Sequence, residues 1–277
     1  MRESVLNIYR PVFPLSQFVS HFTYIQNFYP AHNYDRYLPT GNIELFFDLT
    51  DHEQCMYDSN TFTVTQSVKY VWIQGLRNTF VTIPSKRMNL FFITFSKGMF
   101  YPFLSIINMP LDEITGKIVN GDLILTKEVL ILREQLLSLA TPDDRFLLAE
   151  RYLQKILNRK QELNPFIDFS VKWMQSAQDD TSLQKLSGKI GYSQKHFIQI
   201  FRKNVGVTPK NFLQVLRFQK AIKEINRNSN INWAGLAYDC GYYDQSHFIN
   251  DFKRHSGFTP EEYVLQKREL SNFIPIK

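Results

Sequence analysis

The chain has 277 residues, of which 44% are hydrophobic and 15% aromatic. This length and composition suit two domains with packed cores and are not typical of a disordered chain. We expect no membrane contact and no signal peptide, because no run approaches roughly 18 uninterrupted apolar residues. The two cysteines, Cys55 and Cys240, form no CxxC pair, so we expect a reducing, cytoplasmic location and not a disulfide framework.

The positive charge is confined to one part of the chain. Residues 1–163 carry 16 Lys+Arg and 16 Asp+Glu, whereas residues 164–277 carry 16 Lys+Arg and 10 Asp+Glu, so the whole excess of +6 lies in the C-terminal part. A basic module joined to a neutral one is typical of polyanion binding by one half of a protein. A solvated basic surface would give the same count, so charge alone does not decide.

The first ~100 residues have the pattern of strands. Short apolar and aromatic runs are bounded by turn residues such as those of Pro39–Asn42 and Pro84-Ser85. These runs are Phe22–Phe28, Ile43–Leu49, Val71–Ile73 and Leu90–Phe95. Regular short strands with turns between them predict a sandwich or barrel.

From Asp122 the spacing of apolar residues becomes helical. The leucine-rich face comprises Leu123, Leu125, Val129, Leu132, Leu136 and Leu139. Thr141-Pro142 restarts a helix, with Thr141 as N-cap and Pro142 at the first helical position. We therefore expect a helical hairpin, whose leucine face covers its own barrel or packs on a partner. Asn158–Pro165 is polar and is the expected linker, and everything after it has a helical pattern.

An internal repeat is the strongest signal in the sequence. Gly191, Phe197, Phe201, Gly206 and Pro209 recur as Gly241, Phe248, Phe252, Gly257 and Pro260. From the first phenylalanine the offset is 51 residues, and before it the offset is 50, so the second copy has one extra residue after its glycine.

The repeated residues have the roles that a helix-turn-helix requires. Each first glycine ends a short helix and permits a positive-φ turn, and Ser193 and Asp244 can cap the next helix. Two phenylalanines four residues apart hold that second helix against the first. We predict units at about 182–206 and 232–257, joined by a long helix from Pro209 to about Arg227. A repeated helical hairpin in a scaffold protein remains the alternative.

Residues ~166–268 resemble the DNA-binding domain of the AraC/XylS family of transcriptional regulators, most closely at Gly241–Phe248. The first ~120 residues more weakly resemble the cupin-like sensing domains of that family, at Leu38–Leu45 and Lys97–Phe100. The resemblance implies a sequence-specific regulator, usually an activator, that contacts RNA polymerase and can form a homodimer.

The expected fold is α+β. A cupin-like β-barrel or sandwich with a helical hairpin precedes an all-α domain of two helix-turn-helix units. The expected domains are a sensing domain over 1–120, a hairpin and dimer contact over 121–160, and a DNA-binding domain over 161–277.

The long helix would span ~28 Å at ~1.5 Å per residue. It could therefore place two recognition helices in successive major grooves of double-stranded DNA, ~34 Å apart. The expected base-reading residues are Gln194, Lys195, Ile198 and Gln199, with Gln245, Ser246, Ile249 and Asn250 in the second copy. Amides can bind adenine and aliphatic groups can contact thymine methyls, although the isoleucines could instead pack beside the phenylalanines. The expected phosphate contacts are Arg202, Lys203, Arg217, Lys253 and Arg254, and Lys220 and Lys223 could also touch phosphate.

The N-terminal half is predicted to receive a signal. Six aromatic residues could line a ligand pocket or form plain core: Phe46, Phe47, Trp72, Phe91, Phe92 and Phe95. Arg36, Glu44, Arg77 and Trp72 are the candidate contacts to a small-molecule effector.

We expect no metal or cofactor, since His21, His32 and His52 are scattered, and no catalytic residues, since GxSxG, GxxxxGK[ST] and HExxH are absent. A DNA-repair methyl acceptor is disfavoured because neither cysteine has the expected surroundings. Two alternatives to a ligand-controlled regulator remain: a cupin-type enzyme with an appended DNA-binding module, and a regulator whose N-terminal domain only dimerises.

Overall fold

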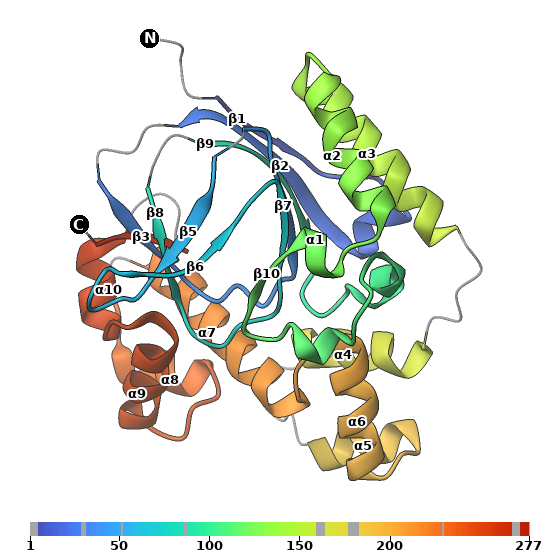
Figure 1. Ribbon diagram of the computed structural model, residues 1–277. Coiled ribbons are helices and arrows are strands. Elements are labelled where there is room, and N and C mark those ends of the chain that lie inside the picture. Colours follow the sequence, from blue (N-terminus) through green and yellow to red (C-terminus); the bar gives the residue numbers. More distant parts are fainter. Residues whose placement is uncertain are drawn as a thin grey trace.

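The computed structural model describes residues 5–28, 32–50, 52–85, 88–158, 164–176, 183–228, 230–267 and 272–276. Its strand-rich N-terminal part forms two antiparallel sheets that do not close into a barrel, and helices follow (Figure 1). The first sheet has six strands in the order β1 (Val5–Tyr9), β2 (Val19–Phe28), β9 (Met88–Phe95), β4 (Glu44–Asp48), β7 (Val71–Gln74) and β10 (Ile118–Asn120). The four strand runs predicted from the sequence lie in β2, β4, β7 and β9, which confirms the strand-rich half.

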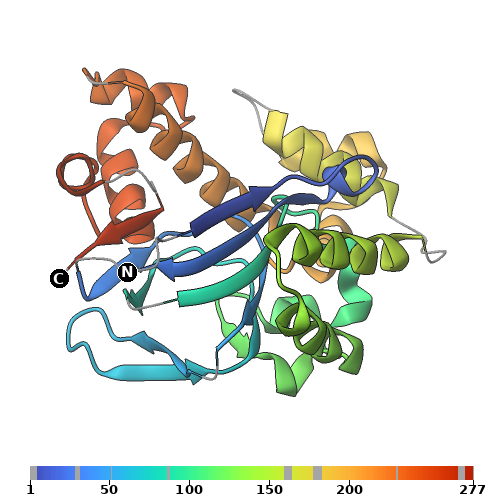
Figure 2. The same ribbon diagram turned by 90° about the horizontal axis from the view of Figure 1, so that it is seen from above.

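The second sheet contains a strand from the part of the chain that was predicted to be helical. Its order is β11 (Phe273–Pro275), β3 (Tyr34–Tyr37), β8 (Val81–Pro84), β5 (Gln54–Tyr57) and β6 (Val64–Val68). Strand β11 comes from the end of the chain and pairs with β3, so the expectation that everything after the linker is helical was wrong (Figure 2). The tripeptide is too short to show a period, and its pairing partner lies more than 200 residues away.

The six aromatic residues proposed as a pocket lining lie on opposite faces of the first sheet. Side chains alternate along a strand, so Phe47, Phe91 and Phe95 enter the main core. Phe46, Trp72 and Phe92 lie on the other face, in a smaller cluster that includes residues of the second sheet. The plain-core alternative therefore holds for Phe47, Phe91 and Phe95, whereas Phe46, Trp72 and Phe92 lie on the inner face.

Three short 3₁₀ helices, η1 (Leu15–Gln17), η2 (Tyr101–Ile106) and η3 (Leu111–Glu113), and helices α1 (Gly121–Ile124), α2 (Lys127–Ser138) and α3 (Pro142–Leu157) complete the N-terminal part. The predicted helical period from Asp122 is broken, because Leu125 and Thr126 are extended and separate α1 from α2. Leu123 is consequently 76% exposed. Val129, Leu132 and Leu136 are buried in the main core, so the leucine face covers the protein's own sheet. Thr141 accepts from the Asp144 amide, as its predicted N-cap role requires.

The C-terminal part is built from α4 (Pro165–Ser176), α5 (Leu183–Ile190), α6 (Gln194–Val205), α7 (Pro209–Arg227), α8 (Trp233–Asp239), α9 (Gln245–Ser256) and α10 (Pro260–Gln266). Most of the predicted linker, residues 159–163, lies outside the described residues. The buried residues of α6 share the main core with the strand-rich part. A second core unites α8–α10 with Leu38 and Ile274. Both helix-turn-helix units are thus packed against the sheets.

Candidate nucleic-acid interface

The two repeats fold as two helix-turn-helix units at opposite ends of α7 (Figure 1). Gly191 and Gly241 adopt φ values of 71° and 76°, as the predicted tight turns require. The Ser193 hydroxyl accepts from the His196 amide at 3.3 Å, and the Asp244 carboxylate accepts from the His247 amide at 2.7 Å. Both second helices, α6 and α9, therefore begin at the predicted caps.

Each second helix is fixed by its two phenylalanines. Phe197 and Phe201 are at most 1% exposed, and Phe248 and Phe252 are fully buried. The helix face opposite these anchors points to solvent. Of the residues predicted to read bases, those exposed are Gln194, Lys195, Gln199, Gln245, Ser246 and Asn250. Ile198 and Ile249 are half-buried, and Ile249 packs against the second core.

The residues predicted to contact phosphate lie in different environments. Lys203 and Lys253 are exposed near the ends of α6 and α9. Arg202 forms an ion pair with Asp112 of η3, with 3.0 Å between Nε and Oδ2. Arg254 donates to Asp251 on its own helix. Arg217 is half-buried on α7. In this conformation both Arg202 and Arg254 already have a carboxylate partner.

Both recognition helices end against the strand-rich part. The last residue of each unit is a left-handed glycine, Gly206 at φ 92° and Gly257 at φ 74°, and the two occupy equivalent repeat positions. The Gly206 carbonyl accepts from the Thr115 hydroxyl, and the Gly257 carbonyl accepts from Arg36 Nη1 at 3.0 Å. The strand-rich part therefore holds equivalent points of the two units.

Arg36 lies in the contact with the second unit. Its guanidinium is 4.2 Å from the Phe258 ring centroid and 4.6 Å from that of Phe80. Beside it, fully buried His255 makes a hydrogen bond through Nδ1 with the Asn78 carbonyl. Arg36 thus packs on Gly257 and Phe258, the two residues that follow α9, and it lies on the opposite face of β3 from the neighbouring Tyr37.

This contact gives a prediction with an internal control. Gly257→Ala would place Cβ 2.6 Å from Phe80 Cε1 and 2.7 Å from Arg36 Nη1, whereas Gly116→Ala at φ 71° meets no atom within 4 Å. Both changes incur the left-handed penalty of ~1–2 kcal/mol. Overpacking should cost Gly257→Ala a further ~1–3 kcal/mol. Urea unfolding of the two variants measures the difference, and equal losses of stability would contradict the described contact.

Two of the remaining effector candidates, Glu44 and Arg77, contact Tyr37. The Tyr37 hydroxyl donates to Glu44 Oε2 at 2.5 Å, and Gln74 Nε2 donates to the same oxygen at 2.9 Å. Arg77 is 3% exposed and its guanidinium lies 4.9 Å from the Tyr37 ring centroid. Burial raises the pKa of the Glu44 carboxyl and lowers that of Arg77. Trp72 stacks on Phe46, which follows Glu44 by two residues and shares its face of β4.

Sequence reasoning missed two residues of the second unit. Asp251 accepts from the Tyr242 hydroxyl at 3.1 Å, and His255 Nε2 lies 3.4 Å from Asp251 Oδ2. Their counterparts in the first copy are Ile200 and Asn204. The replacement of Ile200 and Asn204 by titratable residues in the second copy was the signal that could have found these positions.

No described helix is long and apolar enough to cross a membrane. The described residues contain no group of three or more His, Cys, Asp or Glu side chains that could hold a metal ion. Cys240 is buried in the second core, at the repeat position that Ile190 occupies in the first copy, and burial raises the pKa of its thiol to about 11.

Two complete helix-turn-helix units, with their second helices exposed at the ends of one long helix, define a DNA-binding class of protein. Comparisons with known proteins agree. A family model described as a helix-turn-helix domain matches residues 186–266, and a model described as a domain of unknown function (DUF6597) matches residues 7–120.

An uncharacterized HTH-type transcriptional regulator of Haemophilus influenzae is 29% identical over 90 residues, 32% of this chain and 30% of that protein. The HTH-type transcriptional activator RhaS of Escherichia fergusonii is 24% identical over 117 residues, 42% of this chain and 41% of that protein. The chain thus matches less than half the length of these relatives.

Solved structures are more distant. ToxT of Vibrio cholerae covers 95% of this chain and 98% of its own, with 11% identity and a TM-score of 0.47. A Chromobacterium violaceum regulator with an AraC-type DNA-binding domain covers 38% of this chain and 95% of its own, with 20% identity and a TM-score of 0.35. The helix-turn-helix match and the RhaS relatives support the resemblance of the C-terminal part to the DNA-binding domain of AraC-family transcriptional regulators.

Proposed function

We propose that this chain binds a bipartite site in double-stranded DNA, with α6 and α9 in successive major grooves on one face of the duplex. The observation that carries the proposal is the exposure of two equivalent residues, Gln199 on α6 and Asn250 on α9. These two helices lie at opposite ends of α7. Helix α7 has 19 residues, which corresponds to ~28 Å. Lys203 and Lys253, with Arg217, would supply phosphate contacts, and Arg202 and Arg254 would do so on leaving their carboxylate partners.

Selection of DNA from a random pool by the full chain tests this function. A full chain is needed because both helix-turn-helix units share cores with the sheets. Two conserved elements with centres about one helical turn apart support bipartite reading. Salt-sensitive binding without a motif would instead indicate that the basic repeat is only a polyanion-binding surface.

The RhaS relatives are named transcriptional activators, and on that basis we propose that this chain activates transcription from its site. Contact with RNA polymerase and homodimer formation are further proposals from the family resemblance. In-vitro transcription from a promoter that carries the selected site measures the sign of the effect. A fall in transcript on adding the protein would contradict activation.

We also propose that a small-molecule effector binds between the two sheets and controls DNA binding. Phe46, Trp72 and Phe92 form a continuous aromatic surface on the inner face, with ring centroids 5.1–5.2 Å apart, and Phe46 and Phe92 are half-exposed. The buried Glu44 and Arg77 would give this surface its polar end. We leave Arg36 out of the proposed site because its guanidinium contacts the Gly257 carbonyl and the Phe258 ring, just after α9.

The effector proposal is tested by thermal shift in the presence of metabolite pools. A compound that stabilises the wild-type protein should give no shift with Trp72→Ala, while Leu123→Ala, changed at an exposed position on α1, should respond normally. Loss of the Trp72 ring removes apolar contact area from this surface, and Trp72 lies outside the two cores that hold the helix-turn-helix units. A shift that survives Trp72→Ala places the effector elsewhere, and no shift with any pool favours a purely dimerising domain.

A further inference from the structure

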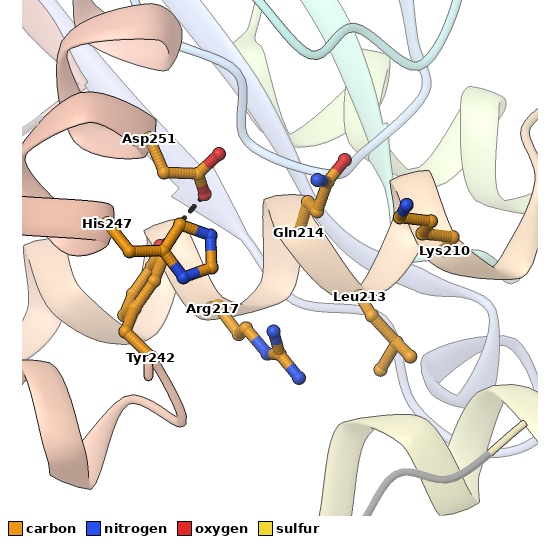
Figure 3. Close-up of a pocket in the computed structure, with 7 residues that line it drawn as sticks. All are labelled: Lys210, Leu213, Gln214, Arg217, Tyr242, His247 and Asp251. Atoms are coloured by element: carbon orange, nitrogen blue, oxygen red, sulfur yellow. Dashed lines mark hydrogen bonds between the residues drawn. The ribbon is translucent and has the colours of Figure 1, made fainter. Parts of the chain in front are cut away.

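A groove lies on the surface of α7 between the two helix-turn-helix units. It has a volume of about 370 Å³ and is lined by Lys210, Leu213, Gln214, Arg217, Tyr242, His247 and Asp251 (Figure 3). The first four of these residues come from α7, Tyr242 comes from the turn of the second unit, and His247 and Asp251 come from α9. The groove therefore joins the spacer helix to the start of recognition helix α9.

The floor of the groove is a polar stripe on α7. Lys210, Gln214 and Arg217 are separated by four and three residues, so their side chains project from one face of the helix. The opposite face is buried, with Phe212, Val215 and Phe218 fully inaccessible. Within the part of the chain that the structure describes, Lys210 and Arg217 form no ion pair with a carboxylate.

The far wall of the groove is formed by the His247 imidazole and by the Asp251 carboxylate, which is already paired with Arg254. His247 projects into the groove from the first turn of α9 (Figure 3). The Asp251 carboxylate accepts from the Tyr242 hydroxyl and from Arg254, and it lies 3.4 Å from His255 Nε2. Arg217 lies beneath the turn, since a Cβ on Gly241 would be 3.6 Å from its Nε. The groove thus carries a net excess of cationic groups.

Other lysines of α7 are directed elsewhere. Lys220 Nζ donates to the Asp239 carbonyl at the end of α8. Lys223 lies close enough to Lys97 of the strand-rich part to lower the pKa of that lysine, which burial and this charge together bring to about 8. Lys220 and Lys223 were predicted as possible phosphate contacts. Neither of them lines the groove, so they do not belong to the stripe formed by Lys210 and Arg217.

We propose that this groove binds phosphates of the DNA strand that crosses between the two major-groove segments read by α6 and α9. The inference rests on the proposed function and extends it. A protein on one face of the duplex that enters two successive major grooves must span the intervening minor groove, whose flanking phosphates face the spacer. Lys210 and Arg217 meet these phosphates through charge, and Gln214 and His247 through hydrogen bonds. Such contacts fix register and affinity without reading sequence.

The test compares Lys210→Gln/Arg217→Gln with Lys220→Gln, a change on the same helix at a lysine that does not line the groove and donates to the Asp239 carbonyl. Binding to the selected duplex is measured over a series of salt concentrations. The double variant should lose about two phosphate contacts, so the slope of log K against log salt should become shallower by about 1.8. Its selected motif should be that of the wild-type protein, and Lys220→Gln should keep the wild-type slope. An unchanged slope in the double variant overturns the proposal.

A second arm uses the wild-type protein and therefore does not depend on how the variant folds. Neutral methylphosphonates replace the phosphates midway between the two conserved elements of the selected duplex. Wild-type affinity should fall. Equal affinity of the wild-type protein for modified and unmodified duplexes overturns the groove proposal. Failure to select any motif overturns the proposed function instead, so the two failures are distinguishable.

Discussion

Phe252→Ala should destabilise the second helix-turn-helix unit and remove its half of the DNA footprint. Phe252 is fully buried, and its ring centroid lies 5.1 Å from that of Phe218, 5.6 Å from Tyr263 and 5.8 Å from Phe248. Truncation of such a residue leaves a cavity and costs about 3–5 kcal/mol. Urea unfolding gives the loss of stability, and footprinting on the selected duplex shows which half-site loses protection.

Tyr243→Ala is the matched control for this prediction. Tyr243 is an aromatic residue of the same unit but is 93% exposed, so its removal should change the free energy of unfolding by no more than about 0.5 kcal/mol. If Phe252→Ala unfolds at the same urea concentration as the control, then the packing of α9 on α7 and α10 described above is wrong.

Gln199→Ala/Asn250→Ala should change which sequence the protein selects. Both amides are exposed, and they occupy equivalent positions of α6 and α9. A bidentate amide contact with adenine contributes about 1–3 kcal/mol of discrimination. Loss of both contacts should therefore remove the preference for an A·T pair at one position in each half-site. Selection from a random pool measures the change directly.

Gln135→Ala provides the comparison, because Gln135 is an exposed amide on α2, outside the helix-turn-helix units. It should select the wild-type motif with wild-type affinity. Retention of both A·T preferences by the double variant would rule out base reading by these two amides. The exposed Gln194, Gln245 and Ser246 would then become the first candidates.

Features that depend on local sequence could be predicted from it. The caps at Thr141, Ser193 and Asp244 and the turns at Gly191 and Gly241 each depend on residues a few positions apart. Their roles follow from hydrogen-bonding groups and backbone freedom that are visible in the sequence. Because the same residues recur in the second copy, the sequence predicted two helix-turn-helix units.

Features that join distant segments could not be predicted in the same way. The pairing of β11 with β3 and the packing of Arg36 on Phe258 each join residues more than 200 positions apart. Neither leaves a periodic pattern, because one strand has three residues and the other contact is a single side chain. The break between α1 and α2 was missed for a different reason. Leu125 keeps helical spacing from Val129 but is held in extended backbone by its bridge with Ile107.

Because both helix-turn-helix units pack on the sheets, an effector bound between the sheets could change how the units are oriented. Thr115 and Arg36, which bind the carbonyls of Gly206 and Gly257, belong to the strand-rich part that would receive the signal. A change in the separation of Thr115 and Arg36 would alter the relative orientation of α6 and α9. Such a change would alter affinity for a bipartite site only if both units bind DNA at once.

The most direct test of bipartite reading is the effect of spacing between the two conserved elements of the selected site. Affinity of the full chain is measured for duplexes in which 5 or 10 base pairs are inserted between the elements. A packed spacer helix of about 28 Å predicts that insertion of about half a helical turn reduces affinity to that of a single half-site, since the elements then face opposite sides of the duplex. An additional full turn should not restore it, because α7 cannot lengthen. Equal affinity for all spacings would contradict simultaneous reading by the two units of one chain.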